Sequence, residues 1–368
     1  MKKIVRYIGM DMHKESIVIA VADRGRAVAE VVATIGNDWL SLLEVLDRLG
    51  PASRLRLCYE AGPTGFDLAR RLTDAGYHCV VVAPSLVPVQ PGRRVKTDRR
   101  DARKLAHFLR SGDLVEVAIP ERQTEALRDL ERARDDAKNA ERAARHQLDK
   151  FLLRQHRIWP GLSKWTCAHW TWLGQQEFAE EAQRRVRDDY ILTVQQATAR
   201  VERLTTDLAD LVENSALRPL VKALMALRGV QLVTAVVIAA EIGDFRRFAH
   251  PSDLMSFLGL VPSVAASGES CRRGRITRTG NRHARRILIE AAWSYRFRPR
   301  GSKAIEARRR PVSAAVRSIA ERAEQRLCRR YQRLVERGKP TQKVVTAVAR
   351  ELAGFVWAIA QQEKLLAA

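Results

Sequence analysis

The chain has 368 residues, and its 46% hydrophobic content predicts two or three domains with packed cores. Its 65 lysines and arginines outnumber its 42 aspartates and glutamates, leaving a net charge of +23. We therefore expect a polyanionic partner, a nucleic acid before a membrane surface. The charged first residues argue against a signal peptide, no apolar run reaches membrane-spanning length, and the five cysteines lack disulfide or zinc spacing. These features predict a cytoplasmic protein with no membrane partner.

The first stretch, residues 1–120, alternates strand-like runs with helical ones. Strands are expected at 4–8, 16–21, 55–59 and 79–83, and helices at 39–49, 66–75 and 101–110. This alternation predicts an α/β domain.

Four carboxylates of this stretch occur where an RNase H-like nuclease needs them. Asp11 follows the first strand, and Glu60 ends the run at 55–59, at the sheet edge where sites collect. Asp98 and Asp101 lie three residues apart at a helix start, so they share one face. Clustered carboxylates repel one another, which predicts Mg²⁺ or Mn²⁺ as a two-ion clamp. The alternative is that Asp98 and Asp101 cap the helix and pair with neighbouring arginines.

Residues 121–217 are expected to be helical and to form a connector. Apolar positions recur at helical spacing in both halves of this stretch, and those from 190 to 211 alternate by four and three, which predicts a coiled coil. Trp159, Trp165, Trp170 and Trp172 fall where the helix reverses. An aromatic cluster that packs this helical hairpin is favoured over base stacking.

Residues 218–368 are expected to form a mainly helical domain. Gly229 marks a turn between helices, which either offers backbone amides to phosphate or joins two packed core helices. Residues 271–310 contain 14 Lys and Arg and 2 Asp and Glu. The excess of 12 positive charges in this window is more than half of the net charge of the chain. We expect phosphate contacts in this window, from Arg272, Arg273, Arg275, Arg278, Arg282, Arg285 and Arg286.

Several motifs follow one another along nearly the whole chain. They are EAGPTGF at Glu60, VKTDRRDA around Asp98 and Asp101, GLVPS at Gly259, SG at Ser267 and ITRTGNRHARR from Ile276. With these motifs the chain resembles the IS-one-ten family of bacterial insertion-sequence transposases, also called DEDD transposases.

This resemblance implies an RNase H-like (RuvC-like) domain, a coiled-coil connector and a transposase domain. It implies that Asp11, Glu60, Asp98 and Asp101 are the DEDD set and that Ser267 is the nucleophile, which joins DNA through a covalent intermediate. It also implies a structured bridge RNA that directs DNA recombination near the bacterial nucleoid. The chain departs from the family's pattern at Gln231, Val264 and Ala266.

The serine hydroxyl is a poor nucleophile at neutral pH and needs activation by a base, a metal or cations. Arg272, Arg273 and Arg275 follow it and could stabilise charge on the phosphate, while Ser270 is a competing candidate. Because Ser267 and the carboxylates are far apart in the sequence, their assembly predicts a homo-oligomer, a dimer or tetramer.

Other functions use parts of the same pattern. A Holliday-junction resolvase or nuclease would hydrolyse DNA with the four carboxylates alone, without Ser267. A sugar-kinase or actin-like ATPase would use the hairpin at Asp11 for phosphate, but the sequence has no second glycine-rich phosphate motif. A structural nucleic-acid binder would need neither site.

Overall fold

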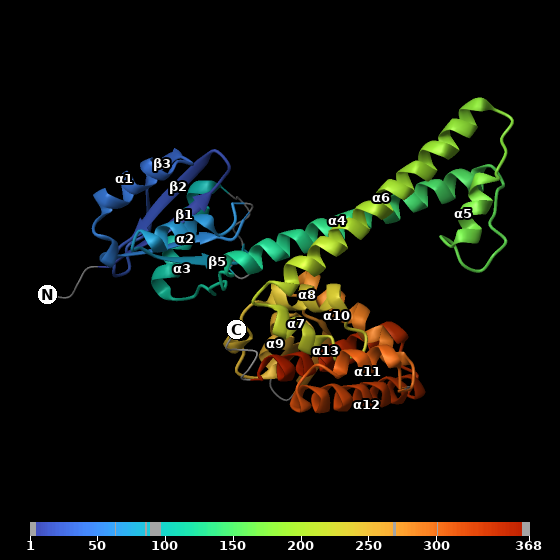
Figure 1. Ribbon diagram of the computed structural model, residues 1–368. Coiled ribbons are helices and arrows are strands. Elements are labelled where there is room, and N and C mark those ends of the chain that lie inside the picture. The colour runs from blue at the N-terminus through green and yellow to red at the C-terminus, as the bar shows by residue number, and fades with distance from the viewer. Residues whose placement is uncertain are drawn as a thin grey trace. The chain divides into compact units, whose positions relative to one another are not determined.

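The computed structural model describes residues 5–62, 64–84, 87–88, 97–267, 270–299 and 301–362, without the side chains of Ala266 and Arg273. The chain divides into two compact units, residues 1–119 and 120–368 (Figure 1). Division of the second unit at residue 217, into a connector and a C-terminal domain, stays a prediction.

The first unit contains a five-stranded sheet with the order β3-β2-β1-β4-β5. The strands are β1 (Arg6–Met12), β2 (Ser16–Ala22), β3 (Glu30–Gly36), β4 (Leu55–Glu60) and β5 (His78–Val82). The first three strands are antiparallel, whereas β4 runs parallel to β1 and β5 parallel to β4. The predicted α/β class is confirmed for this unit. The edge strand β3 was not predicted from the sequence.

Helices cover both faces of this sheet (Figure 1). On one face, α1 (Trp39–Leu49) and α2 (Asp67–Asp74) pack Leu42, Leu46 and Leu72 against strand residues such as Ile8. On the other face, α3 (Asp98–Ser111) packs its small and apolar residues against β1, β2 and β4. The sheet is therefore buried between two helical layers.

The second unit begins with two long helices that pack along each other, α4 (Arg122–Arg154) and α6 (Glu181–Glu213) (Figure 1). Their buried residues follow the predicted stripes, as Leu148 on α4 and Val201 on α6 illustrate. The short helix α5 (Cys167–Gly174) lies at the far end of the pair. Here Trp159 and Trp165 of the predicted tryptophan cluster meet the buried His169 edge to face, and Trp172 stacks on it.

The remaining helices surround α8 (Leu232–Ile242), which is buried from Ala235 to Ile242. They are α7 (Arg218–Leu224), α9 (Pro251–Phe257), α10 (Arg282–Ala292), α11 (Lys303–Arg309), α12 (Ala314–Glu336) and α13 (Thr341–Ala360). Gly229, at a φ of 79°, faces Ala291 and Ser294 so closely that a Cβ would collide with them. The turn before α8 is thus packed against its own fold, which favours the interpretation of two core helices.

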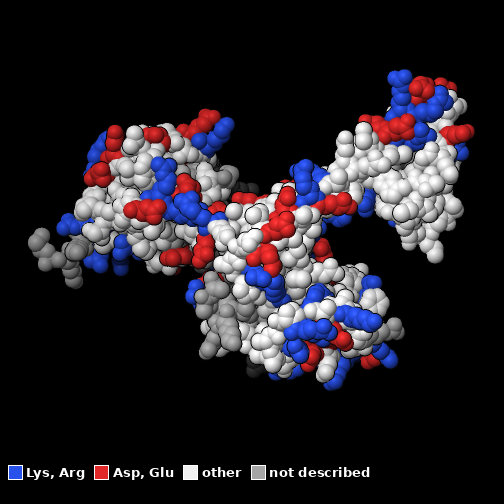
Figure 2. Space-filling model, in the orientation of Figure 1, with Lys and Arg blue, Asp and Glu red and all other residues white. Residues whose placement is uncertain are grey.

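A two-stranded hairpin interrupts these helices. It consists of β6 (Pro262–Ser267) and β7 (Ser270–Ile276), and it was not predicted from the sequence. On the face drawn in Figure 2, Lys and Arg side chains occur on both units. Among the described residues, no helix combines the length and the apolar character needed to cross a membrane.

Candidate functional site

Two neighbouring strands bring Asp11 and Glu60 to one edge of the sheet. Strands β1 and β4 are parallel and pair Met10 with Tyr59, so the next residue on each strand is Asp11 or Glu60. Both carboxylates therefore lie at the carboxyl edge, where the sequence predicted them.

Gly9 allows α3 to approach the same edge. A Cβ on Gly9 would collide with the Ala102 carbonyl oxygen and the Ala106 nitrogen, because the backbone of α3 lies directly on β1. The residues Asp98 and Asp101 occupy the first turn of this helix, one turn before that contact. The close packing thus fixes where the two carboxylates stand relative to Asp11.

His13 joins the carboxylates of β1 and α3. Its Nε2 lies 3.3 Å from Asp11 Oδ2 and 3.4 Å from Asp98 Oδ1. One ligand atom from each of Asp11, His13 and Asp98 lies within 4.8 Å of the others. His13 was not predicted from the sequence, although its position two residues after Asp11, just past the end of β1, was an available signal.

Charge and burial both act on Asp11. Burial raises the pKa of its carboxyl, His13 lowers it, and the negative charges of Asp101 and Asp98 raise it again. Asp11, Asp98 and Asp101 are therefore close enough to repel one another, which a bound cation would relieve. Their oxygen atoms suit hard cations such as Mg²⁺ and Mn²⁺.

The helix start does not use Asp98 as its N-cap. Thr97 occupies that position without a side-chain hydrogen bond, and its carbonyl oxygen accepts from the backbone N–H groups of Arg100 and Asp101. Among the described residues, the ion-pair partner of Asp98 is His13. The capping alternative thus loses its support for Asp98.

Ser267 ends β6 at the tip of the hairpin and is exposed. It pairs with Ser270, whose hydroxyl donates to the Ser267 carbonyl oxygen at 3.2 Å. Because side chains alternate along a strand, the opposed pairs Ser267–Ser270 and Ala265–Arg272 share one face. Arg272 therefore shares the face of Ser267, whereas the register shift between Pro262 and Val264 means that alternation assigns no face to Arg275. The side chain of Arg273 lies outside the described residues.

Two glycines of the sequence motifs allow close backbone packing at the base of this hairpin. Gly259 has a φ of 62° and Gly280 a φ of 67°, conformations that other residues rarely adopt. A Cβ on Gly259 would collide with Thr279, and one on Gly280 would collide with Phe257. The glycines of GLVPS and TGNR thus let two loops cross closely.

The predicted phosphate-binding arginines have different surroundings. Arg285 is buried and donates to the carbonyl oxygens of Leu258 and Thr279, both at 2.8 Å, so it supports the hairpin base. Arg286 pairs with Asp135 at 2.8 Å and Glu290 at 3.0 Å. We leave both out of the phosphate-binding set. Of the predicted arginines whose side chains are described, Arg272, Arg275, Arg278 and Arg282 are exposed.

A buried polar network joins α4, α8 and α10. Glu241 accepts hydrogen bonds from Arg132 at 2.8 and 3.1 Å and from Asn281 at 2.6 Å. Burial alone would raise the pKa of Glu241, but these donors hold it below its usual value. His283 pairs with Glu131 at 2.7 Å. Each of the three potential metal ligands Glu131, Glu241 and His283 has a protein partner, and together they join α4, α8 and α10.

Comparison with known proteins identifies related chains. A transposase model of the DEDD type from IS110 elements matches residues 8–157, and the Transposase IS116/IS110/IS902 family model matches residues 221–306. The putative transposase y4qE of Sinorhizobium fredii is 42% identical over 97% of this chain and 89% of its own length. The transposase for insertion sequence element IS1533 of Leptospira borgpetersenii is 32% identical over 90% of this chain and 97% of its own length. A probable family 20 transposase of Pseudomonas aeruginosa is 24% identical over 97% of both chains.

Proposed function

The chain belongs to the IS110 family of insertion-sequence transposases, and we propose that it recombines DNA with a metal-binding carboxylate site and with Ser267 as nucleophile. As a transposase it is an enzyme whose substrate is DNA. The observation that carries the proposal is the convergence of Asp11, Asp98 and Asp101 from β1 and α3.

We assign the first unit to the RNase H-like, or RuvC-like, class. Three antiparallel strands followed by two parallel ones, with helices on both faces, support this assignment. In such a sheet the carboxyl edge of β1 and β4 is where the acidic residues are needed, and Asp11 and Glu60 occupy that edge.

In this proposal Asp11, Glu60, Asp98 and Asp101 hold Mg²⁺ or Mn²⁺. The bound cations would polarise the scissile phosphate and clamp the attacking and leaving oxygens. His13 contacts Asp11 and Asp98 and so orients both carboxylates. The partial burial of Asp11 limits the water around it, which strengthens its interaction with a cation.

Ser267 supplies the covalent step. Its hydroxyl oxygen forms a bond to phosphorus, the bond from phosphorus to one strand breaks, and that strand leaves as a hydroxyl end carrying the proton. The hydroxyl end of another strand then attacks the same phosphorus and releases Ser267. Arg272, on the face of Ser267, is placed to stabilise the negative charge that develops on the phosphate.

Strand exchange with a carboxylate variant tests the metal site. Asp11→Asn keeps the shape of the side chain but removes its charge, so we expect strand exchange to fall by about 1,000-fold, the loss of several kcal/mol of transition-state stabilisation. Asp74→Asn changes an exposed aspartate at the end of α2 and serves as the matched control. Wild-type rates in Asp11→Asn, with circular dichroism unchanged, would contradict the metal site.

We further propose that a structured RNA encoded by the same element directs the enzyme and that the complex is a homo-oligomer. The net charge of +23 supports binding of a nucleic acid. Sequencing the RNA that copurifies with the protein, together with light scattering of the complex, tests both parts. Copurification of random cellular RNA fragments would contradict the guide RNA, and a monomeric complex would contradict the homo-oligomer.

A further inference from the structure

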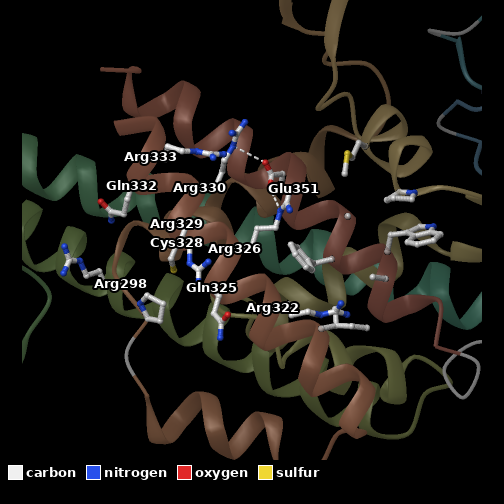
Figure 3. Close-up of a pocket in the computed structure, with 18 of the residues that line it drawn as sticks. Arg298, Arg322, Gln325, Arg326, Cys328, Arg329, Arg330, Gln332, Arg333 and Glu351 are labelled. Carbon is white, nitrogen blue, oxygen red and sulfur yellow. Dashed lines mark hydrogen bonds and ion pairs between the residues drawn. The ribbon is translucent and has the colours of Figure 1, made fainter. Parts of the chain in front are cut away.

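A large pocket lies between α12, α13 and α9 in the second unit (Figure 3). Its volume is about 1610 Å³, larger than the cavities that usually hold small ligands. Met255 and the half-buried rings of Phe355 and Trp357 line one part of it. The pocket thus has room for an extended ligand, and its aromatic rings can contact that ligand.

Arginines of α12 dominate the other side of the pocket (Figure 3). Arg322, Arg326, Arg329 and Arg333 follow one another at intervals of four, three and four residues, so they form a stripe on one helix face. At 1.5 Å per residue the stripe is about 16 Å long. That length spans several consecutive phosphates of one strand.

The pocket carries excess positive charge. Six arginines line it against two glutamates, Glu336 and Glu351. Glu351 pairs with Arg326 at 2.9 Å and with Arg330 at 3.1 Å. Within the described part of the chain, no ion pair forms to Arg322, Arg329 or Arg333.

Apart from the ion pair of Arg326 with Glu351 of α13, the stripe lies away from the core. The buried face of this helix consists of other residues, such as Ile319, Ala323 and Leu327, which enter the core of the unit. Like charges three and four residues apart destabilise a helix by a few tenths of a kcal/mol per pair. A polyanionic ligand would remove this repulsion, and the planar guanidinium groups match phosphate oxygens.

We propose that this pocket binds an unpaired strand of DNA, with its phosphates on the arginine stripe and its bases toward Phe355 and Trp357. The combination of arginines with rings suits a single strand, because a duplex keeps its bases stacked inside. The site is separate from the hairpin arginines that follow Ser267 in sequence. It rests on the proposed function only in that DNA is the substrate.

Binding of the oligonucleotide dT12 by fluorescence anisotropy tests the proposal. The triple variant Arg322→Gln/Arg329→Gln/Arg333→Gln should bind dT12 about tenfold or more weakly at low salt, and its log-log salt slope should fall by about two. The control Arg154→Gln/Arg200→Gln/Arg203→Gln removes the same charge from exposed positions of α4 and α6 and should change little. Measurements in EDTA with Asp11→Asn protein separate this result from the proposed chemistry, because that variant should bind dT12 normally.

A second variant should act in the opposite direction. Glu351→Gln releases Arg326 and Arg330 from their ion pairs, so dT12 binding should become tighter and its salt slope steeper. Unchanged dT12 affinity in the triple variant, or an equal loss in its control, would overturn the proposal. A loss confined to the matching oligonucleotide U12 would assign the pocket to RNA instead. A change only in oligomeric state would make it an interface between copies.

Discussion

At the level of single residues, Gly9 determines how closely α3, with its carboxylates Asp98 and Asp101, packs on β1. It lies two residues before Asp11 on the same strand, and the backbone of α3 occupies the space that a side chain would need. The carboxylates of two distant segments are therefore brought together by a residue without a side chain. The sequence predicted these carboxylates but gave no reason to single out Gly9.

Replacing Gly9 by alanine should push α3 away from β1. We expect Gly9→Ala to lower the free energy of unfolding by about 1–3 kcal/mol, because the added methyl group overpacks the contact. It should also raise the Mg²⁺ concentration needed for strand exchange, since Asp98 and Asp101 move with α3. Urea unfolding and a Mg²⁺ titration measure the two effects.

Gly36→Ala is the matched control, because a Cβ at Gly36 on β3 meets no atom within 4 Å. If both variants unfold alike and need the same Mg²⁺ concentration, the packing of α3 does not position the carboxylates.

Other residues illustrate what sequence reasoning found and missed. Asp11, Asp98 and Asp101 were singled out correctly as neighbours, because strand ends and helix faces are readable from spacing. His13 was missed, although its spacing of two residues from Asp11 was an available signal. Arg285 looks like a surface cation in a basic run, but it is buried, because the crossing loops at Gly259 and Gly280 leave carbonyl oxygens that need a donor.

At the level of secondary-structure elements, the polar network between α4, α8 and α10 is sensitive to pH. The hydrogen bond to Glu131 raises the pKa of His283, with Asp135 adding to the rise, while burial and Arg286 oppose it. A raised pKa means that folding favours protonated His283. Its stabilisation is therefore fully present below about pH 6.5 and is lost as the pH rises through the folded pKa.

His283→Gln should therefore cost the most stability in acid. We expect a loss of about 1.5–3 kcal/mol near pH 5.5, the usual worth of a hydrogen bond to a charged group, and a smaller loss near pH 9. Urea unfolding across this pH range measures the difference from wild type. His146→Gln, on the exposed side of α4, is the control and should show no such trend. A loss that stays constant with pH would contradict the assigned protonation.

Elements with strong periodicity were predictable from the sequence. The helix predicted at 39–49 is α1, and most residues of the predicted stripes on α4 and α6 are buried or half-buried, although Ala140 and Leu211 are exposed. The strand β3 escaped prediction because EVVATIG forms an edge strand with no fully buried residue. The hairpin of β6 and β7 escaped because serines, alanines and arginines dominate it, and its shape depends on contacts at Gly259 and Gly280 rather than on local propensity.

At the level of the whole molecule, the basic residues lie on more than one surface. The sequence drew attention to residues 271–310, yet the arginine stripe of α12 begins beyond that window at Arg322. A charge count finds dense runs, but it cannot find cations spaced along one helix face and gathered by packing against α13. The net charge of +23 is thus distributed among a hairpin, a helix stripe and other exposed positions.

The central claim, that recombination passes through Ser267, is tested most directly by trapping the protein on DNA. A suicide substrate nicked near the crossover, incubated with the protein, its RNA and Mg²⁺, should give a covalent adduct that survives denaturant. Mass spectrometry of the digested adduct should find the nucleotide on Ser267. The adduct should be lost in Ser267→Ala and kept in Ser270→Ala. Cleavage and joining by Ser267→Ala, with no adduct in the wild type, would contradict the account and leave the carboxylates to act alone, as in a resolvase.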